Sequence, residues 1–213
     1  EACDTSEDSV EELTSLIGEA ATTQAGACST LVCACAVLLS SSGVTSALLN
    51  PFFASEAQKR HITAHWTAVI MAAPGAGDLS FALLGTSRAI DCLGNRLALI
   101  YAVVAQITFL VAMGVIGYLP ISAPLYVISL TALRVSAGCT SSLISTSSRS
   151  IIWRAIPHER RMLASQISTG ARGMHLIVGP PLAGSLYQYC GYGGPFFGLA
   201  SLIFIVLMVL VAS

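Results

Sequence analysis

Long apolar runs alternate with short polar breaks along most of the chain. Six of these runs lie near residues 28–49, 62–84, 97–118, 124–146, 163–187 and 195–213. A helix needs about 20 predominantly apolar residues to cross the hydrocarbon core of a bilayer. The pattern therefore predicts an all-α membrane protein with six transmembrane helices within residues 28–213, preceded by a polar segment over residues 1–27.

The fifth run contains the sequence Gly-Pro-Pro-Leu-Ala-Gly at residues 179–184. Proline removes a backbone donor and crowds the preceding turn of a helix. Inside a bilayer such a break is tolerated where neighbouring helices satisfy the freed carbonyls. We therefore expect a broken helix whose glycines, Gly170 and Gly173 included, let another helix approach closely. The predicted kink comprises Gly179, Pro180, Pro181 and Gly184.

Composition agrees with a membrane protein, since 54% of the residues are hydrophobic and 10% are charged, against roughly 25% charged in soluble domains. Seven of the eleven acidic residues lie in the first 19 positions, which hold no Lys or Arg. This segment does not have the basic start and apolar core of a signal peptide. We expect residues 1–27 to form an acidic, disordered tail. Because the first residue is Glu1 rather than Met, we also expect the chain to be a piece of a longer protein.

The basic residues of the predicted loops indicate an orientation, because Lys and Arg favour the cytoplasmic side. Six fall on the side that holds the loops after the second and fourth helices, and two fall on the opposite side. This distribution predicts that the N-terminal tail and the C-terminus are cytoplasmic. The six are Arg88, Arg96, Arg149, Arg154, Arg160 and Arg161, and the two are Lys59 and Arg60.

A faint repeat relates the two halves of the chain. Ser87-x-x-x-Asp91-x-x-Gly94 and Gly184-x-x-x-Gln188-x-x-Gly191 share one frame 97 residues apart. The same shift carries the first predicted helix onto the fourth. Two three-helix units in inverted orientation are the building plan of one half of many transporters.

The second and fourth predicted spans each contain one charged residue, Asp78 and Arg134. An arginine near the middle of a membrane helix costs about 2.5–3.5 kcal/mol on the insertion scale, so Arg134 either serves function or holds helices together through their carbonyls. Gly138, one turn later, allows close helix contact. Asp78 follows Pro74-Gly75-Ala76-Gly77 and could carry a proton, because burial raises the pKa of a carboxyl group. It could equally be the charge partner of Arg134 or Arg172.

The fifth span adds Arg172 and His175, and His175 lies about one turn before Gly179. Histidine titrates near neutral pH, although a packing role is the alternative. We interpret Asp78, Arg134, Arg172 and His175 as a proton and charge network.

A polar loop follows the second predicted helix. We expect Asp91 to lie near the start of the third helix, where a carboxylate caps free N–H groups and meets the positive end of the helix dipole. Gly94 supplies a tight turn, and Arg96 pairs with Asp91 or with acids and carbonyls of a neighbouring helix. These three residues form either an ordinary capped loop or a cytoplasmic latch that holds one access state.

Together these features resemble the major facilitator superfamily. Asp91, Gly94 and Arg96 match its signature loop between helices two and three, with Ser87 and Cys92 in place of a glycine and a basic residue. The fourth-helix and fifth-helix signatures are also present. They are matched at Arg134, Gly138, Gly179, Pro180 and Gly184, with Ala183 and His175 where the pattern has glycine.

Two stretches, residues 51–59 and 179–192, resemble the vesicular amine transporter family, which includes polyamine transporters. The resemblance covers about residues 45–212 and implies the N-terminal six of twelve helices. It further implies proton-coupled antiport of small organic cations, such as polyamines, amines or drugs, by alternating access in a vesicle or plasma membrane. The implied partners are the substrate, protons, the bilayer and a second six-helix half, from a missing C-terminal part or a second copy.

Monoamine members of that family hold the substrate with an aspartate in the first helix. The corresponding position here is Ser42, which cannot carry charge, so a monoamine substrate is disfavoured. Ser42, Thr45, Ser46 and Asn50 could line a substrate cavity by hydrogen bonding, or could simply allow close packing.

Other classes fit less well. An intramembrane serine protease requires Gly-x-Ser-Gly, which the sequence lacks, and a His-box oxygenase requires many histidines, whereas four scattered ones occur. We expect no enzyme activity, no metal site, no cofactor and no nucleic-acid partner. A non-transporting half-length regulator, a degenerate fragment, a symporter and a superfamily transporter of another substrate class stay open as alternatives.

Overall fold

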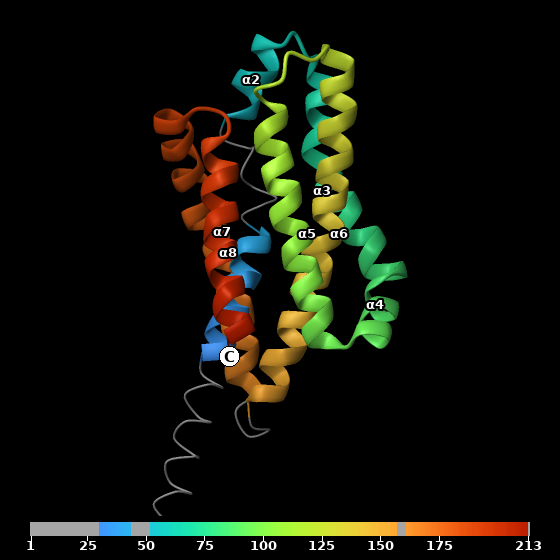
Figure 1. Cartoon of the computed structure of the whole chain (residues 1–213), viewed down its shortest axis with the longest axis vertical. Coiled ribbons are helices and arrows are strands. Elements are labelled where there is room, and N and C mark those ends of the chain that lie inside the picture. Colours follow the sequence, from blue (N-terminus) through green and yellow to red (C-terminus); the bar gives the residue numbers. More distant parts are fainter. Residues whose placement is uncertain (1–29, 44–51, 157–160, 213) are drawn as a thin grey trace, which may run out of the picture.

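The computed structural model describes residues 30–43, 52–156 and 161–212, although several side chains of the helix that begins at Arg161 lie outside that description (Figure 1). The predicted acidic tail, residues 1–27, is outside it as well. Helices dominate the described residues, so the predicted all-α class is confirmed. A first helix covers Thr30–Gly43. It is followed by α2 (Phe53–Lys59), α3 (Ala64–Leu84), α4 (Thr86–Leu93), α5 (Asn95–Ile116), α6 (Ala123–Ala155), α7 (Arg161–Cys190) and α8 (Gly194–Ala212).

The long helices run side by side in one bundle (Figure 1). At its centre is α6, which packs on α3 and on α5, while α8 packs on α5 and on α7. One end of the bundle holds α2, the α5–α6 loop and the α7–α8 turn. The opposite end holds the α4–α5 turn, the end of α6 and the end of α8. The bundle thus brings together loops that are far apart in the sequence.

Four helices within the described residues are long and apolar enough to cross a membrane, namely α3, α5, α6 and α8. They confirm the second, third, fourth and sixth predicted runs. The described part of the first run is the shorter apolar helix Thr30–Gly43. The fifth run corresponds to α7, which is 30 residues long.

The expected break at the Gly-Pro-Pro sequence is wrong, because α7 continues through Pro180 and Pro181 to Cys190. Each proline removes its own N–H donor and crowds the turn before it, yet the segment stays helical, and the kink at these residues stays a prediction. A Cβ placed on Gly170, Gly173 or Gly184 would meet nothing within 4 Å. The close helix approach expected at these glycines is therefore not made by the described residues.

Two short helices occupy segments predicted as loops. The turn expected after the second span is in fact α4, which Gly94 ends with a φ of +76°. Gly191 has the corresponding place between α7 and α8 and a φ of +71°. These are the two glycines of the predicted repeat, and they lie at opposite ends of the bundle (Figure 1).

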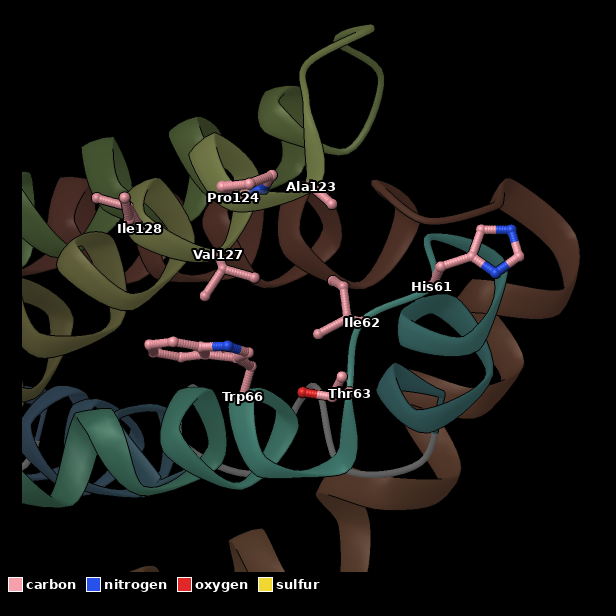
Figure 2. A pocket seen from close by; sticks show the side chains of 8 residues that line it. All are labelled: His61, Ile62, Thr63, Trp66, Ala123, Pro124, Val127 and Ile128. Atoms are coloured by element: carbon pink, nitrogen blue, oxygen red, sulfur yellow. The ribbon is translucent and has the colours of Figure 1, made fainter.

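The other short helix, α2, ends in a Schellman-type motif. The N–H of Ile62 donates to the carbonyl of Ala57 at 2.9 Å, and the N–H of His61 donates to that of Gln58 at 3.1 Å. His61 consequently has a φ of +55°, a left-handed conformation in which glycine is the usual residue. The turn that follows packs over the start of α6 and leaves a groove there (Figure 2).

Candidate functional site

The contact between α3 and α6 is backbone against backbone. A Cβ on Gly77 would collide with the carbonyl of Val135, and a Cβ on Gly138 would collide with the carbonyl of Pro74. The Cys139 thiol also reaches the Gly77 carbonyl at 3.5 Å. The close contact expected at Gly138 is therefore present, with α3 as the partner helix.

Arg134 is the largest fully buried side chain among the described residues, with 2% of its surface exposed. It follows Tyr126 and Leu130 at intervals of four along α6, and all three face the interior. Asp78 is partly buried on α3. Asp78 lies at the Gly77–Gly138 crossing, because its backbone N would be 2.9 Å from a Cβ on Gly138, and Arg134 precedes Val135, whose carbonyl faces Gly77.

Hydroxyl groups of α6 form hydrogen bonds with side chains of α4 and α5. Thr140 donates to the Gln106 side-chain oxygen of α5, Thr86 lies 3.4 Å from Ser142, and Asn95 donates to Ser150 at 2.7 Å. These bonds give α6 a polar seam within an otherwise apolar bundle.

The first helix joins the same seam through Ser42. The Ser141 hydroxyl donates to the Ser42 carbonyl at 3.3 Å, whereas the Ser42 hydroxyl donates to Leu39 of its own helix at 2.9 Å. Ser42 is therefore buried against α6. The other predicted cavity residues, Thr45, Ser46 and Asn50, lie outside the described residues. The backbone of Arg172 and His175 lies in α7, and their side chains are likewise outside the description.

The predicted latch is only partly as expected. Asp91 is exposed on α4, and Gly94 is the N-cap of α5 without any side-chain cap hydrogen bond. The expected cap by Asp91 is wrong, because α4 keeps this residue in a separate helix. Arg96 donates to the Leu210 carbonyl of α8 at 3.4 Å. A carbonyl of a neighbouring helix was one of the partners predicted for Arg96, and Asp91 was the other candidate.

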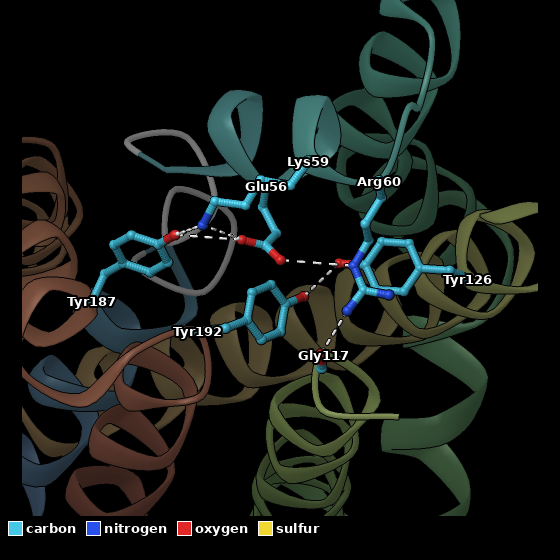
Figure 3. A network of polar contacts seen from close by, with 7 residues as sticks. All are labelled: Glu56, Lys59, Arg60, Gly117, Tyr126, Tyr187 and Tyr192. Carbon is cyan, nitrogen blue, oxygen red and sulfur yellow. Dashed lines mark hydrogen bonds and ion pairs between the residues drawn. The ribbon is translucent and has the colours of Figure 1, made fainter. Parts of the chain in front are cut away.

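A second polar site lies at the opposite end of the bundle, centred on Glu56 (Figure 3). Its carboxylate binds the Lys59 ammonium at 3.2 Å and lies 3.7 Å from the Arg60 guanidinium. Tyr187 of α7 accepts a hydrogen bond from Lys59 at 3.1 Å and donates one to Glu56 at 3.4 Å. The hydrogen bond to Tyr187 and the nearby Glu56 raise the pKa of Lys59 above its ordinary value.

Arg60 connects this cluster to the α5–α6 loop. Its guanidinium donates to the Gly117 carbonyl at 2.6 Å and lies 4.2 Å from the centre of the Tyr126 ring. Tyr126 in turn donates to the hydroxyl of Tyr192 at 3.0 Å. Burial raises the pKa of Tyr192 far above its ordinary value, so its hydroxyl stays protonated. The Tyr192 ring lies against Gly117, where a Cβ would collide with it.

Sequence reasoning did not assign functional roles to these residues, although a signal was present. Glu56 and Lys59 lie in the first of the two stretches that resemble the vesicular amine transporter family, and Tyr187 and Tyr192 lie in the second. The structure brings the two stretches together, with the Phe52 and Tyr187 rings stacked at 4.6 Å.

Comparison with known proteins gives consistent matches. A family model described as Major Facilitator Superfamily matches residues 31–213. The MFS-type transporter SLC18B1 of Mus musculus is 25% identical over 164 residues, which cover 77% of this chain and 35% of the relative. The Homo sapiens protein of the same name is 25% identical over 156 residues, 73% of this chain and 34% of the relative. The chain thus spans about a third of the length of the curated relatives it matches.

Proposed function

The chain belongs to the major facilitator superfamily, and from this premise we propose that it forms the N-terminal half of a proton-coupled antiporter of small organic cations. Members of this superfamily are membrane transporters, and the spans described above make this chain an integral membrane protein. Polyamines and related amines are the proposed substrates. A serine at position 42 argues against a monoamine, since the position then offers no carboxylate to a cation.

The proposed architecture is six transmembrane helices in two inverted three-helix units. The left-handed glycines 94 and 191 support it, because each ends one helix just before a spanning helix, at opposite ends of the bundle. A shift of 97 residues also carries α3 onto the start of α7 and α5 onto α8. A second half of similar build, from the rest of a longer chain or from a second copy, would complete the pathway.

Arg134 is the single observation that carries the transport proposal. A guanidinium buried in a membrane-length helix is unfavourable without a functional use, and the same helix carries the seam of hydroxyl groups. We assign it to the proton and charge network with Asp78, Arg172 and His175. The Asp91–Gly94–Arg96 segment is proposed as the cytoplasmic latch, and Gly179, Pro180, Pro181 and Gly184 as the flexible part of α7.

Reconstitution of the full-length protein tests this proposal. In vesicles that carry a pH gradient, addition of spermidine should dissipate the gradient, because the antiporter exchanges the amine for protons. Arg134→Ala should abolish this response while membrane insertion stays intact, and Arg154→Ala, an exposed arginine at the end of α6, should retain it.

Two results would contradict the proposal. Uptake that is unchanged in Arg134→Ala would remove Arg134 from the mechanism. A gradient that spermidine leaves intact, in wild-type vesicles with both halves present, would favour a non-transporting regulator or a transporter of a different substrate class.

A further inference from the structure

We propose that the acidic segment at residues 1–19 docks its carboxylates into a cavity lined by two arginines, Arg96 and Arg154, at the end of the bundle that holds the α4–α5 turn. This inference goes beyond the proposed function, because it concerns a contact within the chain and requires neither transport nor a particular substrate. The acidic segment itself lies outside the described residues, and the cavity that would receive it lies within them.

The cavity measures about 400 Å³ and is lined by the first helix, the α4–α5 turn and the end of α6. Leu31 comes from the first helix, Arg96 and Leu97 from the start of α5, and Arg154 from the end of α6. The α4–α5 turn and the end of α6 lie at the same end of the bundle (Figure 1). A volume of this size is within the about 300–1,000 Å³ typical of ligand pockets, so it accommodates side chains of a docked segment.

The lining of the cavity is positively charged. It has two guanidinium groups and no carboxylate. The two ion pairs within the described residues both involve Glu56, at the opposite end of the bundle, so neither arginine forms an ion pair with a described acid. Arg96 donates to the Leu210 carbonyl at 3.4 Å, but a guanidinium has five N–H donors, which leaves others for a carboxylate. Charge-assisted pairing of guanidinium with carboxylate is among the strongest hydrogen bonding in proteins.

The sequence that leads into the cavity supplies the matching charge. Residues 1–19 contain seven acids and no Lys or Arg. The last of these acids, Glu19, precedes the cavity residue Leu31 by 12 positions, and a chain of that length extends over at most about 40 Å. Exposed ion pairs are individually weak, but a short tether gives an effective concentration on the order of millimolar. The tethered carboxylates are therefore the anions best placed to occupy the cavity.

Photo-cross-linking identifies the occupant. Leu97, a cavity residue that is 53% exposed, is replaced by p-benzoylphenylalanine in the full-length protein, which is placed in phosphatidylcholine nanodiscs. After irradiation and digestion at acidic residues, mass spectrometry should find the label joined to peptides from residues 1–19. The same label at Leu125, which is 52% exposed at the start of α6 and the opposite end of the bundle, should not reach these peptides.

Charge variants test the pairing. Arg96→Gln combined with Arg154→Gln should lower the yield of this cross-link about fivefold, because two exposed ion pairs are lost. Arg88→Gln is the matched control, since Arg88 is exposed on the neighbouring α4 but does not line the cavity, and it should keep the yield. Raising the salt concentration from about 0.1 M to about 1 M should weaken the cross-link in the labelled protein, because salt screens exposed charges.

Three outcomes would overturn the proposal. A cross-link to phospholipid instead of residues 1–19 would assign the cavity to a lipid headgroup. A cross-link only to another segment of the full-length protein would show that this other segment covers the cavity. A yield that stays unchanged when both arginines are replaced would show that they do not hold the carboxylates of the acidic segment.

Discussion

Gly77 and Gly138 set the distance between α3 and α6, since each lacks the Cβ that would strike the partner backbone. A flexible side chain can move aside, but a carbonyl held in a helix cannot do so without shifting the whole helix. This backbone contact therefore requires glycine at both positions, close to the two charged residues that transport is proposed to use.

Replacing Gly77 with alanine should destabilise the protein, because the added methyl group forces the two backbones apart. Overpacking of this kind lowers the free energy of unfolding by about 1–3 kcal/mol. Gly75→Ala is the matched control in the same helix. A Cβ there meets nothing within 4 Å, and alanine favours the helix by roughly 0.5–1 kcal/mol. Equilibrium unfolding in mixed micelles measures both changes, and a similar loss in the two variants would contradict the tight crossing.

His61 offers a prediction of opposite sign. Its backbone φ of +55° is strained for any residue with a side chain, so His61→Gly should raise the free energy of unfolding by about 0.5–1 kcal/mol. The same substitution in the first turn of α3, His65→Gly, should lower it by about 0.3–0.5 kcal/mol. If His61→Gly were destabilising in the same assay, the left-handed conformation of this residue would be refuted.

At the scale of single elements, α2 is held by buried apolar residues on one face and by charged residues on the other. This helix has seven residues and is too short to be stable alone. Phe53 and Ala57 are buried beneath it, while Glu56 and Lys59 reach across to Tyr187. The short helix therefore joins the end of α7 to the rest of the bundle.

Lys59 reports on this contact, because it is the sole lysine of the sequence. Tyr187 is the main cause of its raised pKa. Tyr187→Phe should therefore lower the pKa of Lys59 toward its ordinary value of 10.5, as measured by NMR of the ¹³C-methylated amine, with signals from any lysine elsewhere in the full-length protein assigned separately. Tyr189→Phe, whose ring is 87% exposed, should leave the pKa unchanged, and an equal effect of both substitutions would argue against the contact.

The sign of the pH dependence follows from the raised pKa. A group whose pKa is higher in the folded protein stabilises the fold fully at pH values below its ordinary pKa. The contribution of Lys59 is therefore present at neutral pH and disappears as the pH rises through its folded pKa, above 10.5. Hydrogen exchange in α2 should increase over that alkaline range in the wild type, and earlier in Tyr187→Phe.

The long elements were predictable and the short ones were not. Apolar length alone located α3, α5 and α8 to within two residues of their ends. It missed α2 and α4, which are too short and too polar to give a membrane signal. It also ended α6 nine residues early. The last part of this helix is rich in polar residues, which give no membrane signal although they are helical. Helical periodicity carries no information on hydrogen bonds to neighbouring helices, and those bonds keep this segment in place.

Some residues of the candidate sites could likewise be predicted from the sequence, and others could not. Arg134 and Gly138 could be identified from sequence, since charge and glycine are conspicuous in an apolar run. The cluster of Glu56, Arg60 and Tyr192 could not, because Tyr192 follows Arg60 by more than 100 residues and reaches it only where α2, the α5–α6 loop and the α7–α8 turn meet at one end of the bundle.

At the scale of the whole molecule, the bundle separates its basic residues between two ends. Arg96 and Arg154 lie at the end that holds the α4–α5 turn, and Lys59 and Arg60 lie at the other (Figure 1). The bias of basic residues toward the first end predicts that this end is cytoplasmic.

Native cysteines can test that orientation. Cys92 and Cys190 are both exposed and lie at the ends of α4 and α7, at opposite ends of the bundle. In sealed, right-side-out vesicles a membrane-impermeant maleimide should modify Cys190 and spare Cys92, and inverted vesicles should give the reverse pattern. Peptide mass spectrometry distinguishes the two sites, and labelling of both from one side would contradict the spanning arrangement.

The glycine crossing also constrains how a transport cycle can operate. Two helices packed backbone against backbone should move as one unit in the proposed cycle, which leaves only side-chain movement between Asp78 and Arg134. In the proposed cycle, protonation of Asp78 would then have to be transmitted to a helix outside this pair. We propose α7 for that role, because a Cβ on its Gly170, Gly173 or Gly184 meets nothing within 4 Å.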